Sequence, residues 1–129
     1  MSRPTISLPD PRPLVYIRAP YSDENPFERQ RNVLRARVLG GRINLTGLAW
    51  AIVPHNASEG IAHTLGPLEW YAYCLALMPS AKGVWWSGHR TTGCDLEGIE
   101  TERLRLPTGT EGIDDLVSFL HSLKRPGDR

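Results

Sequence analysis

The sequence has few cysteines and no long apolar segment. Among its 129 residues are only two cysteines and no run of 18 apolar residues, so no membrane-spanning helix is expected. Residues 1–13 contain no apolar core, and we therefore expect no secretory signal. Cys74 and Cys94 lack the CxxC spacing of redox and zinc sites. They indicate buried thiols in a reducing compartment, and a cytoplasmic protein is the expectation.

Several motifs that would assign a chemistry are also missing. The sequence lacks GxGxxG, GxxxxGK[ST] and GxSxG, as well as the HxE…PCxxC pattern of zinc deaminases. These absences argue against the familiar phosphate-binding loops, a serine hydrolase of the nucleophile-elbow type and a zinc deaminase. The spacing of the histidines and cysteines does not fit zinc either. We expect neither a metal nor a cofactor.

A charge excess of one sign is absent too. The formal net charge is +1, from 15 basic and 14 acidic residues, so no global field draws the protein to nucleic acid or to an anionic membrane. Locally, residues 26–46 carry five arginines and one acidic residue, whereas residues 94–115 carry seven acidic residues and two arginines. Two interpretations remain open: self-association through these opposite patches, and nucleic-acid binding by the arginine-rich segment. We regard nucleic-acid binding as the less favoured of the two.

The order of apolar segments indicates one α/β domain over residues 14–125, after a flexible arm at residues 1–13. Short β-branched and aromatic runs alternate with longer helical segments, which is typical of a parallel sheet. Gly40 and Gly41 weaken the first helix and are candidates for its end. The predicted strands are 14–17, 48–53, 84–86 and 104–106, and the predicted helices are 26–39, 67–78, 93–103 and 112–124.

Two of these helices have apolar positions that predict a buried face. In the first helix these residues are Phe27, Val33, Leu34 and Val38. In the last helix they are Ile113, Leu116, Val117, Leu120 and Leu123.

Ligands of parallel sheets bind at the carboxyl ends of the strands. The loops that start at Ala19, Pro54 and Ser87 each leave a predicted strand at that edge, so we expect them to converge. The third loop leads through Thr91, Thr92 and Gly93 into a helix, whose free amide groups form an anion site.

Glu97 follows about one turn later. The helix dipole stabilises an ionised carboxylate there by about 0.3–1 kcal/mol, which suits a nucleophile. The plainer interpretation is that Glu97 is one of several solvated helix charges, together with Asp95, Glu100 and Glu102.

The other two loops offer further candidates. Tyr16 lies in the first strand and is able to place its hydroxyl at the sheet edge, with Ser22 and nearby amides available to a phosphate or a sugar. The alternative is that Tyr16 belongs to the core. His55 directly follows the second strand and is able to donate to a ligand, although a lone histidine is more often structural.

The segments YIRAPYSDENPFERQRNVLRAR, AIVPH and GHRTTGCDLEGIETERLRLP together resemble the nucleoside 2-deoxyribosyltransferase-like superfamily, over about residues 14–107. The resemblance implies a Rossmann-like or flavodoxin-like three-layer domain with a four- to five-stranded parallel sheet, assembled as a homodimer or larger. It also implies cleavage or transfer of the N-glycosidic bond of a (deoxy)nucleoside or nucleoside 5′-monophosphate. Glu97 falls on the family's nucleophile and Tyr16 on the tyrosine that orients it.

The candidate site combines both lines of reasoning. Its expected catalytic residues are Glu97 and Tyr16. Departures from the family's pattern are Arg18 in place of a small residue, Cys74 in place of an acidic residue and Lys82 in place of an aspartate. They leave open an inactive module that only binds or senses a nucleotide. The expected substrate-binding residues are Arg18, Ala19, Pro20, Tyr21, Ser22, His55, His89, Thr91, Thr92 and Gly93.

Overall fold

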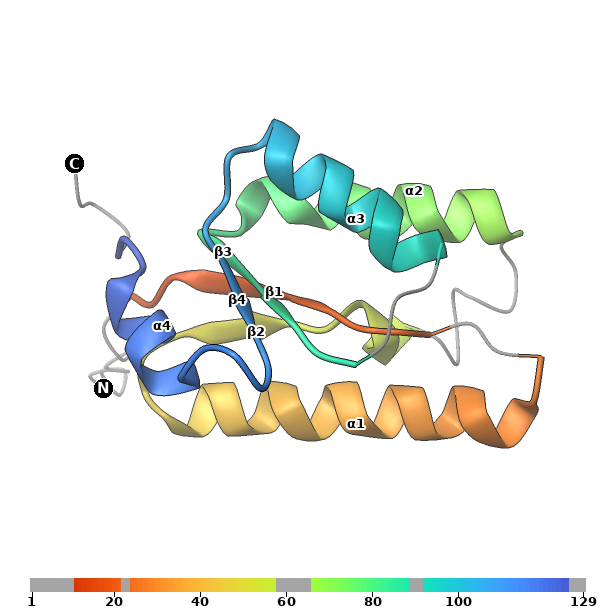
Figure 1. The fold of residues 1–129 in the computed structure, drawn as a ribbon, viewed down its shortest axis with the longest axis horizontal. Helices are drawn as coiled ribbons and strands as arrows, with labels where there is room; N and C mark the ends of the chain where they lie inside the picture. Colours follow the sequence, from red (N-terminus) through yellow and green to blue (C-terminus); the bar gives the residue numbers. More distant parts are fainter. Residues whose placement is uncertain (1–10, 22–23, 58–65, 89–91, 126–129) are drawn as a thin grey trace, which may run out of the picture.

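A four-stranded, fully parallel sheet lies between two layers of helices (Figure 1). The structure, a computed structural model, describes residues 11–21, 24–57, 66–88 and 92–125. The expected Rossmann-like or flavodoxin-like three-layer architecture is confirmed, with strand order β2-β1-β3-β4. The elements are β1 (Leu14–Arg18), α1 (Pro26–Leu45), β2 (Trp50–Ile52), η1 (Pro54–Ala57), α2 (Pro67–Leu77), η2 (Met78–Ser80), β3 (Gly83–Trp86), α3 (Thr92–Arg103), β4 (Thr108–Thr110) and α4 (Leu116–Ser122).

The two faces of the sheet follow from the alternation of side chains along its central strand. In β1, Val15 and Ile17 pack into the apolar cluster that lies between the sheet and the helices α1 and α4. Tyr16, between them, belongs to the cluster on the opposite face, which α2 and α3 cover (Figure 1). The same strand therefore supplies a close-packed apolar face and a face that carries polar groups.

The predicted buried face of α1 is wrong. Phe27, Leu34 and Val38 are exposed. The helix instead buries a stripe that includes small and polar residues, because it lies close to the sheet. Its buried residues are Asn32, Ala36, Leu39, Gly40 and Ile43.

Gly40 explains both the close approach and the length of α1. A Cβ atom at this position would lie 2.5 Å from Val53 Cγ2, so the helix contacts the segment after β2 where only hydrogen fits. The helix does not end at Gly40 and Gly41 but continues to Leu45. Packing of Leu39, Gly40 and Ile43 against the sheet stabilises the helix through this segment despite the low helix propensity of its two glycines.

The fourth strand lies further along the chain than predicted. Leu104 and Leu106 do not form a strand but pack against the α2/α3 side of the core. Backbone hydrogen bonds close the end of α3 here, including Leu106 N to Thr101 O, with Arg105 at φ 55. The strand is Thr108–Thr110, whose residues pair with β3.

The last helix is shorter than predicted. Asp115 caps it by accepting a hydrogen bond from Ser118 N at 2.9 Å, so α4 begins at Leu116. Ile113 lies in the preceding turn and is exposed, and Val117 is also exposed. The N-cap side chain, and not the apolar periodicity, sets the start of this helix.

Part of the predicted N-terminal arm contacts the domain. Trp50 N donates to Pro13 O at 3.0 Å, and Arg12 Nη1 donates to Asn44 O. The Arg12 guanidinium also lies over the Trp50 ring, 3.8 Å from its centre. Across the described ranges, no helix has the length and apolar character needed to span a bilayer.

Candidate active site

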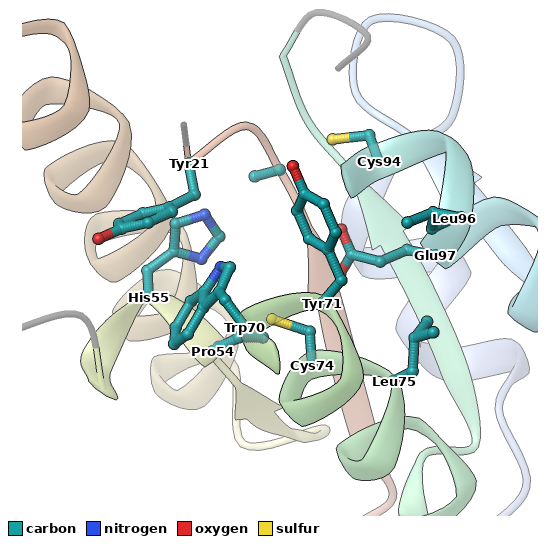
Figure 2. Close-up of a pocket in the computed structure, with 11 residues that line it drawn as sticks. Tyr21, Pro54, His55, Trp70, Tyr71, Cys74, Leu75, Cys94, Leu96 and Glu97 are labelled. Atoms are coloured by element: carbon teal, nitrogen blue, oxygen red, sulfur yellow. The ribbon is translucent and has the colours of Figure 1, made fainter. Parts of the chain in front are cut away.

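The strand order places a crevice at the carboxyl ends of β1 and β3. The chain runs from β1 to β2 on one side and from β3 to β4 on the other, which is the switch point where parallel sheets bind ligands. A hollow lies on the α2/α3 side of this edge. Figure 2 shows Tyr21, His55 and Trp70 on one side of the hollow and Glu97, Leu96 and Cys94 on the other.

The described parts of the three loops converge as expected. His55 Nε2 lies 3.0 Å from Pro20 O, and Ser87 N donates to Arg18 O at 2.9 Å. The Tyr21 carbonyl accepts from Asn32 Nδ2 at 3.3 Å. The segment after β1 is therefore held by contacts with α1, with η1 and with the segment after β3.

Glu97 and Tyr16 meet inside this edge of the fold. Glu97 is 8% exposed and Tyr16 is fully buried. The Tyr16 hydroxyl lies near enough to the Glu97 carboxyl and to the Cys74 thiol for these groups to shift one another's pKa. Within the described residues, however, this hydroxyl completes no hydrogen bond of standard geometry. The site is thus a carboxyl group with two buried neutral donors beside it.

Burial decides how these groups titrate. Loss of hydration raises the pKa of Glu97 to about 7, against the opposing effects of the Tyr16 hydroxyl and the Arg18 charge. Burial and then the Glu97 charge raise the pKa of Cys74 to about 12. The pKa of Tyr16 is raised for the same two reasons. Near neutral pH, Tyr16 and Cys74 keep their protons, and negative charge in the cluster resides on Glu97.

The expected reason for Glu97 ionisation is wrong. Because α3 begins at Thr92, Glu97 lies beyond the first turn, where the effect of the helix dipole has faded. Its pKa is raised by burial and not lowered by the helix end. The interpretation of Glu97 as a solvated surface charge is wrong as well, since its side chain is buried.

His55 presents one ring nitrogen without a partner. Because a carbonyl only accepts, Nε2 carries the hydrogen that contacts Pro20 O. Nδ1 is buried and finds no hydrogen-bond partner in the described part of the chain. Burial lowers the pKa of His55, and the positive charge of Arg37 acts in the same direction, against the Pro20 carbonyl contact. Neutral His55 therefore keeps Nδ1 as an acceptor in the wall of the hollow.

The other predicted residues differ in where the structure places them. Ala19 and Tyr21 line the hollow, and Pro20 supports His55. Arg18 lies outside the lining, with its guanidinium 4.5 Å from the centre of the Trp86 ring. Thr92 and Gly93 form the first turn of α3, whereas Ser22, His89 and Thr91 lie outside the described residues.

The sequence analysis named Cys74 of α2 as a departure from the family's pattern, but it missed the aromatic residues of this helix. Trp70, Tyr71 and Cys74 line the hollow from this helix. The rings of Trp70 and Tyr21 lie 5.0 Å apart, and Tyr73 stacks on Trp70 at 5.5 Å. The available signal was the run Trp70-Tyr71 with Cys74 one turn later, which places aromatic groups on the face of α2 that meets the strand ends.

The described residues include no cluster of three or more histidine, cysteine or carboxylate side chains placed to hold a metal ion. The two cysteines are both buried, as the sequence predicts.

The fold and site define a parallel α/β domain with a buried carboxylate at its switch point. Comparison with protein-family models, with curated proteins and with solved structures finds no match to this chain.

Proposed function

We propose that the protein cleaves or transfers the N-glycosidic bond of a (deoxy)nucleoside or nucleoside 5′-monophosphate, with Glu97 as nucleophile. The observation that carries the proposal is a buried carboxyl group beside the Tyr16 hydroxyl in a hollow with aromatic walls. Planar rings such as Tyr21, Trp70 and Tyr71 stack well on nucleobases. A carboxylate with a pKa near 7 is strongly nucleophilic once ionised.

The proposed reaction has two steps. A Glu97 oxygen attacks the anomeric carbon through an oxocarbenium-like transition state, and the C–N bond breaks. The nucleobase leaves with the electron pair of that bond and takes a proton from water. Water or a second nucleobase then attacks the same carbon, loses a proton and releases the Glu97 carboxylate. Water yields a hydrolase and a second nucleobase yields a transferase.

Two neighbours of Glu97 have distinct roles in this scheme. The Tyr16 hydroxyl orients the attacking carboxylate and stabilises it when it is regenerated, because a phenol donates a hydrogen bond more strongly to a charged oxygen. The unpartnered Nδ1 of His55 accepts a hydrogen bond from a substrate hydroxyl or amine. His55 lines the hollow from η1, directly after β2, whereas Tyr16 lies behind the lining in the middle of β1.

The direct test is release of free nucleobase. The full-length protein is incubated with a panel of deoxynucleosides, ribonucleosides and their 5′-monophosphates, with and without a second nucleobase as acceptor. We expect base release or exchange with at least one member, and loss of this activity in Glu97→Gln. Equal activity in Glu97→Gln would remove Glu97 from the mechanism.

A binding module of the same fold is the second candidate. It is favoured by Cys74, which stands beside Glu97 with a pKa raised to about 12 and supplies no second carboxylate. A thermal shift induced by a nucleotide, with no turnover across the same panel, supports this candidate. Turnover of any nucleoside rejects it.

A second copy of the chain is the partner that we propose for the outer face of α1. Phe27, Leu34, Val38 and Leu45 are 75%, 62%, 56% and 89% exposed. Their spacing of seven, four and seven residues aligns them along one side of the helix, the α1 stripe. A row of large exposed apolar side chains of this kind is typical of an interface.

Charge complementarity favours a second copy over an unrelated partner. Exposed arginines such as Arg31 and Arg35 flank the α1 stripe. The exposed acidic residues Glu111, Asp114 and Asp115 precede or cap α4, which lies toward the C-terminal end of α1 (Figure 1). Antiparallel pairing of two α1 helices brings the acidic segment of each copy toward the arginine-rich half of its partner's helix.

Sedimentation velocity tests this interface. We expect a dimer at micromolar concentration that dissociates in Leu34→Glu. Ile99→Glu is the matched control, because Ile99 is an exposed apolar residue on α3, across the sheet from α1. A monomeric wild-type protein, or a dimer disrupted by Ile99→Glu and not by Leu34→Glu, contradicts the proposal.

A further inference from the structure

Arg18 ends β1 on the same side of the sheet as Tyr16, but it does not line the hollow. Its register partner is Trp86, the last residue of β3, and its guanidinium stacks on the Trp86 ring. Its Nε atom is buried and has no hydrogen-bond partner in the described ranges. Stacking and burial hold this cation at a defined place behind the wall that carries Glu97.

Gly98 provides the space that Arg18 occupies. A Cβ atom on Gly98 would lie 2.7 Å from Arg18 Nη2, 2.9 Å from Cζ and 3.0 Å from Nη1. The guanidinium is thus pressed against the backbone of α3 at the residue directly after Glu97. A side chain of any size at position 98 would force it away.

A buried carboxyl group needs such a neighbour in order to ionise. Glu97 has lost most of its hydration, which favours the protonated acid. Tyr16 and Cys74 face it as neutral groups, and neutral His55 lies on the far side of the hollow. Asp95, on the same helix, lines the groove that Arg18 also borders. Among these groups, Arg18 brings the positive charge.

We infer that Arg18 is a positioning residue whose charge favours the ionised form of Glu97, and that Trp86 and Gly98 fix the guanidinium in the place where it does so. Arg18 acts through α3 and does not touch the substrate. The positive charge of Arg18 acts to lower the pKa of Glu97, which is the direction that this inference requires. The proposed effect of Arg18 on Glu97 needs no substrate, whereas its value for catalysis rests on the proposed function.

Direct titration of Glu97 tests the inference without any substrate. The full-length protein is labelled at the glutamate side-chain carboxyl carbon, and the Glu97 resonance is assigned from its loss in Glu97→Gln. We expect the titration midpoint of Glu97 to rise by about 1 pH unit in Arg18→Met. Arg18→Lys should restore most of the wild-type midpoint because it retains the charge. Arg29→Met, on the opposite face of the sheet, is the control and should leave the midpoint unchanged.

Gly98→Ala provides an independent variant that retains Arg18. The added methyl group displaces the guanidinium, and we expect the Glu97 midpoint to rise, by less than in Arg18→Met. An unchanged midpoint in both Arg18→Met and Gly98→Ala, or a failure of Arg18→Lys to restore it, overturns the inference. If Arg18→Met does not fold, the Lys and Ala variants decide. An inactive protein that still shows these shifts refutes the proposed function alone.

Discussion

The two faces of the sheet differ in what they bury. The α1/α4 face buries aliphatic and aromatic side chains against α1. Gly40 lets the backbone of α1 approach Val53 so closely that only a hydrogen atom fits between them. The α2/α3 face, built on the same strands, buries Tyr16, Cys74 and Glu97. Apolar burial stabilises the folded state, whereas burial of a carboxyl group that ionises destabilises it. One face thus supports the fold, and the other contains a group whose burial the proposed reaction would explain.

Glu97→Gln should produce the largest effect on activity. It should also distinguish most clearly the face that contains the proposed nucleophile from the face that stabilises the fold. It removes the proposed nucleophile while preserving shape, so we expect kcat to fall at least about 1000-fold. The variant should remain folded, as measured by circular dichroism and thermal unfolding. A variant that unfolds instead would mean that Glu97 supports the structure.

The pH dependence of stability should expose the cost of burying Glu97. Its pKa is about 7 in the folded protein and 4.5 in the reference state. The folded state therefore holds the proton longer, and the contribution of Glu97 to stability is lost as pH rises from 4.5 to 7. We expect Glu97→Gln to gain about 3 kcal/mol relative to the wild type between pH 4.5 and 8.

Urea unfolding of both proteins at pH 4.5, 6, 7 and 8 measures this difference. A difference in the free energy of unfolding that stays constant over the whole range would show that Glu97 titrates normally.

Tyr16→Phe should reduce activity with little effect on folding. Loss of the orienting hydroxyl is expected to lower kcat about 10- to 100-fold. Because this hydroxyl completes no hydrogen bond within the described residues, its removal should change the free energy of unfolding by less than about 1 kcal/mol. Steady-state kinetics and urea unfolding check both values. Full activity with a large loss of stability would assign Tyr16 to the core alone.

Gly40→Ala tests the α1/α4 face, with Gly41→Ala as its matched control one residue away. The Gly40 variant places a methyl group 2.5 Å from Val53 Cγ2 and should lose about 1–2 kcal/mol of stability. Nothing lies within 4 Å of a Cβ at Gly41, so Gly41→Ala should gain about 0.5–1 kcal/mol from helix propensity. Neither variant should change kcat. Equal effects on stability would contradict the close approach of α1.

The sequence was sufficient to predict the parallel α/β fold, the convergence of the loops and the position of Glu97 and His55 near this edge of the sheet. These follow from the order of apolar runs and from where each strand ends. The buried face of α1 was not predictable by counting large apolar residues, because the helix buries Ala36 and Gly40 and exposes Phe27. Because α1 lies so close to the sheet, only small residues fit where the two meet.

The electrostatics of the site depend on burial, which sequence position does not reveal. Glu97 near a helix start was expected to be stabilised as an ion, yet its depth raises its pKa. Arg18, adjacent to the site in sequence, stacks on Trp86, a residue 68 positions later that becomes its neighbour only through strand pairing. Trp70 and Tyr71 likewise reach the site only because α2 crosses over the sheet.

The most direct measurement of the central claim is the mass of the protein after a brief reaction with substrate. The protein is mixed with the nucleoside panel, quenched in acid, digested and analysed by mass spectrometry. The account predicts a glycosyl adduct on the peptide that contains Glu97, absent in Glu97→Gln. Release of nucleobase with no adduct at Glu97, or with an adduct at another residue, would contradict it.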